Sequence, residues 1–305
     1  MSFSPADNIQ DLQNFGEFGG VNPSISDSST YTFMAAKTMA DTFEGNTDGC
    51  HLYSRHTTPS NLCLGEALAA MEGTETANVS ASGMGAITPV LLQLCGAGDH
   101  IVSSRTIYGG TYAFLKNFTP RFAIQTSFVD ITNLEIVEAS ITNSTKVLYC
   151  ESVSNPLLEV ADIKGLAALA KKYKLTLVVD NTFSPLSISP IQLGADVVVH
   201  SLTKFINGSS DAVGGVVCGS QEFIDQLRSV IDGACMLLGS TMDSLRASSI
   251  LKNLRTLHIR MKQHSYNASY LASKFQEDGI KTVYPGLESH PSHQLFTSMM
   301  NTEYG

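Results

Sequence analysis

Between residues 76 and 218 the chain alternates short apolar runs with segments of helical periodicity, and this alternation limits the folds open to it. The apolar runs predict strands, at residues 76–81, 100–103, 123–129, 146–151, 176–180, 197–200 and 214–218. The segments between and directly after them predict helices, at residues 85–95, 111–117, 134–139, 163–172 and 221–231. Short strands rich in Val and Ile that alternate with helices are typical of a mostly parallel sheet with helices on both faces. We therefore expect an α/β fold.

The segments on either side predict an arm and a second domain. Residues 1–60 are rich in small polar residues, so we expect an extended arm, with a short helical piece at 31–43, that lies on its own subunit or on a neighbour. A helix at 61–72 would open the large domain, 61–242, and end at Gly73. Residues 243–276 lack Pro and Gly and predict one long linker helix, followed by a strand at 280–284. Residues 243–305 are thus expected to hold the linker and the start of an incomplete C-terminal α+β domain.

Composition argues against several classes of partner. A chain of 305 residues with 43% hydrophobic residues can bury a large core. Its 19 Lys and Arg against 28 Asp and Glu leave a net charge of −9, and no basic run suits nucleic acid or an anionic membrane. It has no apolar run of the roughly 20 residues that a bilayer requires and no signal-peptide pattern, so we expect a cytoplasmic protein. The six cysteines lack metal-ligand spacing, so we expect reduced thiols and no metal site.

The stretch from Asp196 to Gly208 contains a lysine whose position needs a reason. An apolar strand ends there in Ser201, Thr203 and Lys204. Because open α/β sheets bind ligands at the carboxyl ends of their strands, we expect Lys204 to face a cleft. The structural alternative is a solvated lysine at a strand end.

Three other junctions between strands and loops point to the same cleft. Asp180 ends a buried strand, where its carboxylate can pair with a cation or cap the following turn. Gly83 and Met84 lie where small residues lead from a strand into a helix, so their amides can bind phosphate. Tyr108 precedes two glycines and can stack on an aromatic ligand, or pack half-buried.

Two competing motifs fail in context. The lone G-x-G at Gly83 and Gly85 is followed by Thr88 where a dinucleotide fingerprint needs Gly or Ala, which argues against NAD. Ser201-Leu-Thr-Lys204 matches the S-x-x-K of serine acyl enzymes. The partner motifs of those enzymes are missing, because Asp211 is followed by Ala212 and Thr38 by Met39.

Taken together, these motifs resemble a known family. The motifs are Tyr53-Ser-Arg55, Ser82-Gly-Met-Gly85, Tyr108-Gly-Gly, Asp180-Asn-Thr182 and Ser201-Leu-Thr-Lys204 with Gly208. In this order and spacing, the chain from Tyr53 onward is similar to the pyridoxal-phosphate (PLP) enzymes of cysteine and methionine metabolism, which include methionine γ-lyase, cystathionine γ-synthase and lyases, and O-acetylhomoserine sulfhydrylase. The resemblance implies the aspartate aminotransferase-like fold, known as fold type I.

The resemblance also implies a role for each site residue. Lys204 would hold pyridoxal 5'-phosphate as a Schiff base and move protons, and Asp180 would pair with the ring nitrogen. Tyr108 would stack on the ring and protonate a departing sulfur group. The remaining cofactor ligands would be Ser201, Thr203, Gly83 and Met84 at the phosphate, Asn155 near the ring hydroxyl, and Tyr53 and Arg55 at the phosphate of the neighbouring subunit. The chain would then be at least a dimer, and a dimer of dimers by family resemblance.

The implied reaction is γ-elimination from a sulfur amino acid, which yields a 2-oxo acid, ammonia and a thiol. Methionine γ-lyases typically carry Cys after the Tyr-Gly pair, whereas Gly110 stands here, as in many sulfhydrylases and synthases. Replacement on an O-acylhomoserine is therefore the alternative. A PLP-binding or non-catalytic oligomeric α/β protein is the alternative of another class. The family's arginine for the substrate carboxylate lies in the C-terminal domain, so we assign that role to none of these 305 residues.

Overall fold

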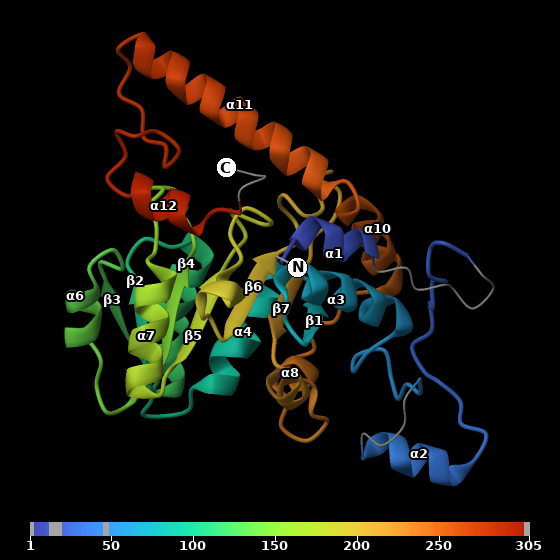
Figure 1. Cartoon of the computed structure of the whole chain (residues 1–305). Helices are drawn as coiled ribbons and strands as arrows, with labels where there is room; N and C mark the ends of the chain where they lie inside the picture. Colours follow the sequence, from blue (N-terminus) through green and yellow to red (C-terminus); the bar gives the residue numbers. More distant parts are fainter. Residues whose placement is uncertain (1–2, 12–19, 45–48, 302–305) are drawn as a thin grey trace.

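The computed structural model describes residues 3–11, 20–44 and 49–301, which are built around one seven-stranded sheet (Figure 1). Its order is β1-β7-β6-β5-β4-β2-β3. The strands are β1 (Thr76–Ser80), β2 (His100–Ser104), β3 (Gln125–Val129), β4 (Thr145–Glu151), β5 (Thr176–Asp180), β6 (Val197–Ser201) and β7 (Gly215–Gly219). Only β7 runs antiparallel to its neighbours in this sheet, to β1 and to β6. The predicted parallel α/β architecture and all seven predicted strands are confirmed, with ends that differ by at most two residues.

Helices connect most of the successive strands and cover both faces of the sheet. Up to the last strand they are α3 (Pro59–Glu72), α4 (Gly83–Leu94), α5 (Gly109–Ala113), α6 (Leu134–Ala139) and α7 (Ile163–Tyr173), with a π turn at Phe114–Phe118 and 3-10 turns at Thr119–Phe122 and Pro190–Leu193. After β7 follow α8 (Gln221–Arg228) and α9 (Ala234–Leu238). Several of these helices have an N-cap residue whose side chain accepts a hydrogen bond from a backbone amide of the first turn: Thr58 for α3, Asp162 for α7 and Ser220 for α8.

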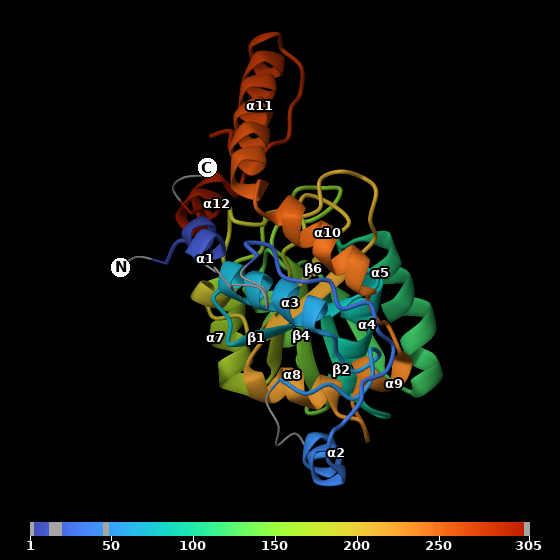
Figure 2. The same ribbon diagram turned by 90° about the vertical axis from the view of Figure 1, so that its right-hand side faces the viewer.

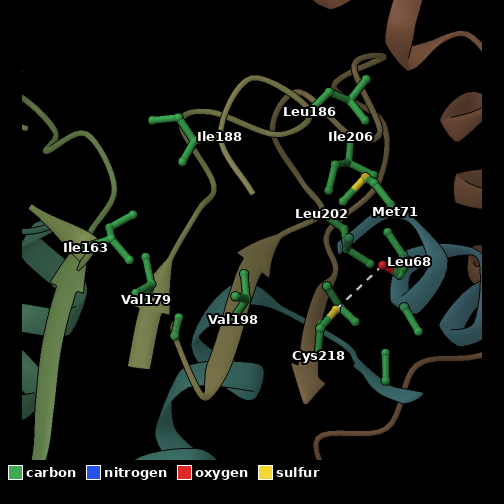
Figure 3. Packing of buried hydrophobic residues seen from close by; sticks show 14 of the residues in the cluster. Leu68, Met71, Ile163, Val179, Leu186, Ile188, Val198, Leu202, Ile206 and Cys218 are labelled. Carbon is green, nitrogen blue, oxygen red and sulfur yellow. Dashed lines mark hydrogen bonds between the residues drawn. The ribbon is translucent and has the colours of Figure 1, made fainter. Parts of the chain in front are cut away.

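Two apolar clusters fix these helices to the sheet. On one face, Leu68 and Met71 of α3 pack with Val179, Val198 and Cys218 from three neighbouring strands (Figure 3). The opposite face packs residues of α4 and α8 against alternate positions of the same strands, such as Val178 and Val199. Burial on both faces explains why the strands are continuous apolar runs.

The arm contributes two short helices. In α1 (Pro5–Asp11), the Asn8 amide donates to the Ala70 carbonyl at 3.1 Å and so joins α1 to α3. The predicted helical piece at 31–43 is confirmed as α2 (Ala36–Phe43), which lies apart from the sheet in both views (Figures 1 and 2). A β-bridge between Thr30 and Tyr53 links the two sides of the arm.

The prediction of one helix over 243–276 is wrong. The segment forms α10 (Ser244–Leu254) and α11 (Leu257–Glu277), separated at Arg255 and Thr256. The carbonyl of Asn253 accepts from the amide and hydroxyl of Thr256, at 3.2 and 3.1 Å, and from the Arg260 guanidinium at 3.0 Å. These short-range donors end α10 without Pro or Gly, because they satisfy a carbonyl that a continuing helix would use.

The predicted strand at 280–284 is also wrong. These residues follow α11, which projects beyond the sheet (Figure 2), and they pair with no strand among the described residues. The chain then returns to the sheet through α12 (His293–Met299), where Asn301 donates its amide to the Ser187 carbonyl at 2.7 Å. An extended apolar run becomes a strand only where a sheet edge is within reach. Among the described residues, no helix is both long enough and apolar enough to cross a membrane.

Candidate active site

A cleft of about 810 Å³ opens where the strands end. The carboxyl ends of β1, β2, β4, β5 and β6 lie at this one edge because those strands run in the same direction. The loops that follow them line the cleft, which has the size of a typical small-molecule site. Its lining includes Ser82, Gly83, Met84, Tyr108, Glu151, Asn155, Asp180, Thr182, Phe183, Ser201, Thr203, Lys204 and His264.

The structure brings eight of the ten predicted site residues together. Those eight, Lys204, Tyr108, Asp180, Ser201, Thr203, Gly83, Met84 and Asn155, all line the cleft. The other two lie elsewhere. The Arg55 guanidinium donates to the Met236 carbonyl at 2.7 Å and stands over the Tyr53 ring, 5.6 Å from its centroid. Their predicted role in a neighbouring subunit stays a prediction.

One wall of the cleft can bind an anion. Ser82 caps α4 by accepting the Gly85 amide at 2.9 Å. Gly83 and Met84 occupy the first turn of this helix, where amides have no partner within the helix and the helix dipole is positive. A Cβ atom on Gly83 would lie 2.8 Å from the Ser201 Cβ atom, so the absence of a side chain lets α4 approach Ser201. Backbone amides and a hydroxyl thus converge as a phosphate would require.

Thr203 has a second role in this wall. Its hydroxyl accepts the Gly214 amide at 3.1 Å and donates to the Gly214 carbonyl at 3.3 Å. These bonds tie the loop after β6 to the start of β7. Because a hydroxyl oxygen has one proton, donation to an anion would replace its bond to the carbonyl.

Two buried carboxylates stand side by side at the centre. Glu151 ends β4 and Asp180 ends β5, and the two residues are partners in the parallel register. Asp180 accepts the Thr182 amide at 2.9 Å, while the Tyr149 hydroxyl lies 3.5 Å away. Burial raises the pKa of Asp180 above its ordinary value. A buried carboxylate of this kind can be stabilised in its charged form by a cation placed against it.

Sequence reasoning missed Glu151. Burial, with the adjacent Asp180 charge, raises the pKa of its carboxyl to about 7. Its two oxygens accept the amide of Tyr108 at 2.6 Å and the amide of Asn155 at 2.8 Å. The available signal was its position, because Glu151 ends a predicted strand in the same way as Asp180.

Lys204 lies in the loop that joins β6 to β7. Its amide donates to the Ser201 carbonyl at 3.3 Å, and the Gly208 amide donates to its carbonyl at 2.8 Å. The ammonium group is exposed in the cleft and makes no hydrogen bond or ion pair with a described residue. Arg260 of α11 holds the next two residues by donating to the carbonyls of Phe205 and Ile206. The loop is therefore fixed while the amine stays free to react.

These residues fit one kind of cofactor. The wall of amides and hydroxyls suits a phosphate, the free amine suits a carbonyl carbon, and the buried Asp180 suits a protonated ring nitrogen. Tyr108, 48% exposed, offers an aromatic face on the same cleft. The fold and the site together define an α/β enzyme of the PLP-dependent class.

Comparison with known proteins agrees with this class. The chain matches the model of the Cys/Met metabolism PLP-dependent enzyme family over residues 7–305, and it belongs to that family. It is 46% identical to "Methionine gamma-lyase" of Arabidopsis thaliana, over 99% of this chain and 70% of that protein. It is 37% identical to "L-methionine gamma-lyase" of Pseudomonas putida, over 97% and 74%, and 41% identical to "O-succinylhomoserine sulfhydrylase" of Pseudomonas aeruginosa, over 88% and 66%.

Solved structures show the same relationship. A candidate O-acetylhomoserine (thiol)-lyase of Campylobacter jejuni superposes with a TM-score of 0.90 at 29% identity, over 99% of this chain and 82% of that one. That structure carries a pyridoxyl-lysine phosphate residue. Cystathionine gamma-lyase of Lactobacillus plantarum gives a TM-score of 0.88 at 28% identity, over 99% and 76%. The expected family, fold type and cofactor are thereby confirmed.

Proposed function

We propose that this chain is a carbon–sulfur lyase that acts by γ-elimination on a sulfur amino acid, releasing a 2-oxo acid, ammonia and a thiol. The main observation that supports this proposal is that Lys204, Asp180 and Tyr108 all line one cleft, in a chain that is 46% identical to a methionine γ-lyase. When bound, PLP supplies an electron sink that makes the Cα and Cβ protons of an amino acid acidic.

The chain's own residues then supply proton transfer and positioning. Lys204 is the proposed attachment residue, and its amine, free in the cleft, moves the proton from Cα. Asp180 holds the ring nitrogen, and the amides of Gly83 and Met84 with the Ser201 hydroxyl hold the phosphate. Tyr108 gives its phenolic proton to the departing sulfur. Asn155 lies on the wall beside Glu151, where its side-chain amide can orient the ring hydroxyl.

Replacement chemistry is the second candidate, and a specific observation favours it. Gly110 follows the Tyr-Gly pair, as in many sulfhydrylases and synthases, and the chain is 41% identical to an O-succinylhomoserine sulfhydrylase. In that case an incoming thiol or sulfide, instead of water, would complete the reaction on an O-acylhomoserine.

Separate incubations divide the two candidates. The purified protein is given methionine, cystathionine, or O-acetylhomoserine plus sulfide, and 2-oxo acid and thiol products are measured. Release of 2-oxobutanoate from methionine alone supports the lyase. Turnover only when a thiol or sulfide is added refutes it in favour of replacement. A protein that binds PLP but converts none of these substrates would support the non-catalytic alternative, with Lys204→Ala as the background control.

We also propose a cytoplasmic homo-oligomer, at least a dimer, in which Tyr53 and Arg55 reach the phosphate of the neighbouring site. Their position outside their own chain's cleft supports this arrangement. Mixing Arg55→Ala chains with Lys204→Ala chains provides the test. In a mixed dimer one site would regain both residues, so activity should appear that neither variant has alone. No recovery in verified mixed dimers would refute the shared site.

A further inference from the structure

Glu151 connects two loops that line the cleft. Its carboxylate lies at the carboxyl end of β4, and Tyr108 and Asn155 belong to the loops that follow β2 and β4. One oxygen accepts the Tyr108 amide at 2.6 Å and the other accepts the Asn155 amide at 2.8 Å. The residue is 7% exposed, so water competes little for these bonds. One side chain therefore determines where two cleft-lining residues sit relative to each other.

The charge of Glu151 matters for this connection. Hydrogen bonds from amides to an ionised carboxylate are stronger than bonds to a neutral acceptor. A protonated carboxyl keeps only weakened acceptors, and an amide side chain offers one acceptor and one donor. Both changes would release at least one loop.

We propose that Glu151 is a positioning residue that, in its ionised form, holds Tyr108 and Asn155 in the arrangement needed for turnover. The inference rests on the proposed function for the roles of Tyr108 and Asn155, whereas the two amide bonds are independent of it. Glu151 acts through those backbones rather than on the reacting atoms. We therefore expect the loss of activity at acidic pH to follow the protonation of Glu151.

The groups around Glu151 decide whether it ionises. Asp180 on β5 opposes its negative charge, and the amides of Tyr108 and Asn155 favour it. Burial raises the pKa of Asp180. A favourable charge interaction with His200 on β6 and a hydrogen bond from Tyr149 on β4 offset part of that rise. Lys204 brings a cation to the same cleft. A positive group against Asp180 would remove part of the opposition between the carboxylates and so favour ionised Glu151.

The test compares Glu151→Gln with Glu159→Gln. Glu159 lies in the same loop region, forms a 3.5 Å ion pair with Arg105 and does not line the cleft, so it is a matched control. Hydrogen exchange of the Tyr108 and Asn155 amides is measured in the cofactor-free proteins at about pH 8, above the Glu151 pKa of about 7, where its carboxylate is ionised. Because a bond to a charged acceptor contributes about 1.5–3 kcal/mol, exchange of at least one amide should rise about tenfold or more in Glu151→Gln. Unchanged exchange at both amides would overturn the proposal.

Two further measurements separate positioning from a general structural defect. Glu151→Gln should keep PLP after purification, but its turnover number should fall and its rate should no longer drop on the acidic side of the pH profile. Glu159→Gln should retain both the turnover number and that acidic drop. An unaltered acidic drop in an active Glu151→Gln enzyme would also overturn the proposal. If Glu151→Gln does not fold, the wild-type amide proton shifts of Tyr108 and Asn155 give the answer, because both should titrate with one midpoint. Independent or absent titration would refute the connection. Failure of the wild type to bind PLP would refute the proposed function while leaving the exchange result valid.

Discussion

A methyl group on Gly83 tests the phosphate-binding wall. In Gly83→Ala the new Cβ atom would lie 2.8 Å from the Cβ, 2.9 Å from the hydroxyl and 3.2 Å from the Cα of Ser201. Ser201 cannot retreat freely, because its amide donates to the Thr182 hydroxyl at 2.7 Å. The start of α4 must therefore move away from Ser201. Overpacking of this kind typically costs about 1–3 kcal/mol of folding stability.

The same movement should weaken PLP binding. If it displaces one amide from the phosphate, the loss of a charge-assisted hydrogen bond is about 1.5–3 kcal/mol, or roughly 10- to 100-fold in affinity. Cofactor-free protein is titrated with PLP, and urea unfolding gives the stability. Gly96→Ala is the control, because its new methyl group would come no closer than 3.8 Å to another group. Equal PLP affinity in Gly83→Ala and wild type would refute this phosphate site.

Three other substitutions test the centre of the cleft and the loop that carries Lys204. The pKa of Glu151 is raised from an ordinary 4.5 to about 7, so the free energy of unfolding of wild type, relative to Glu151→Gln, should fall as pH rises through this range. Urea unfolding at about pH 5 and about pH 8 should show a fall of about 2–3 kcal/mol. A difference between the two proteins that is the same at both pH values would contradict this prediction. Because burial raises the pKa of Asp180, Asp180→Asn should stabilise the cofactor-free protein at neutral pH. The same substitution should lower the affinity for PLP by more than about tenfold. A variant that loses both stability and PLP affinity would contradict this assignment of Asp180. Arg260→Lys should lower the free energy of unfolding by about 1.5–3 kcal/mol, because an ammonium group cannot reproduce the hydrogen bonds to the carbonyls of Phe205, Ile206 and Asn253. The control Arg121→Lys, at an exposed position, should stay within about 0.5 kcal/mol of wild type in the same assay. Equal stabilities of the two variants would contradict the account of the Lys204 loop.

Local pattern was enough to predict the sheet and most of the site. Strands such as β5 and β6 are buried on both faces, so their apolar runs carried an unambiguous signal. Since parallel strands end at one edge, Asp180, Tyr108 and Lys204 could be placed in one cleft from their positions after strands. The predicted assembly of these side chains required no knowledge of the connecting helices.

The errors arose where contacts that leave no pattern in the sequence decide the local structure. The break between α10 and α11 depends on Arg260 and Thr256, which saturate the Asn253 carbonyl, and neither Pro nor Gly marks it. The run at 280–284 has strand composition but follows the projecting helix α11 (Figure 2) and pairs with no strand among the described residues. Glu151 was missed because its partners are backbone amides, which leave no motif in the sequence.

The most direct test of the central claim is to locate the cofactor on the chain. The purified protein is saturated with PLP, treated with borohydride to fix the adduct, digested and mapped by mass spectrometry. The account predicts a pyridoxyl group on Lys204 in wild type and none in Lys204→Ala, with Lys252→Ala, a change outside the cleft, unaffected. A modified lysine elsewhere, or no adduct in saturated wild-type protein, would contradict the assignment of this cleft as the PLP site.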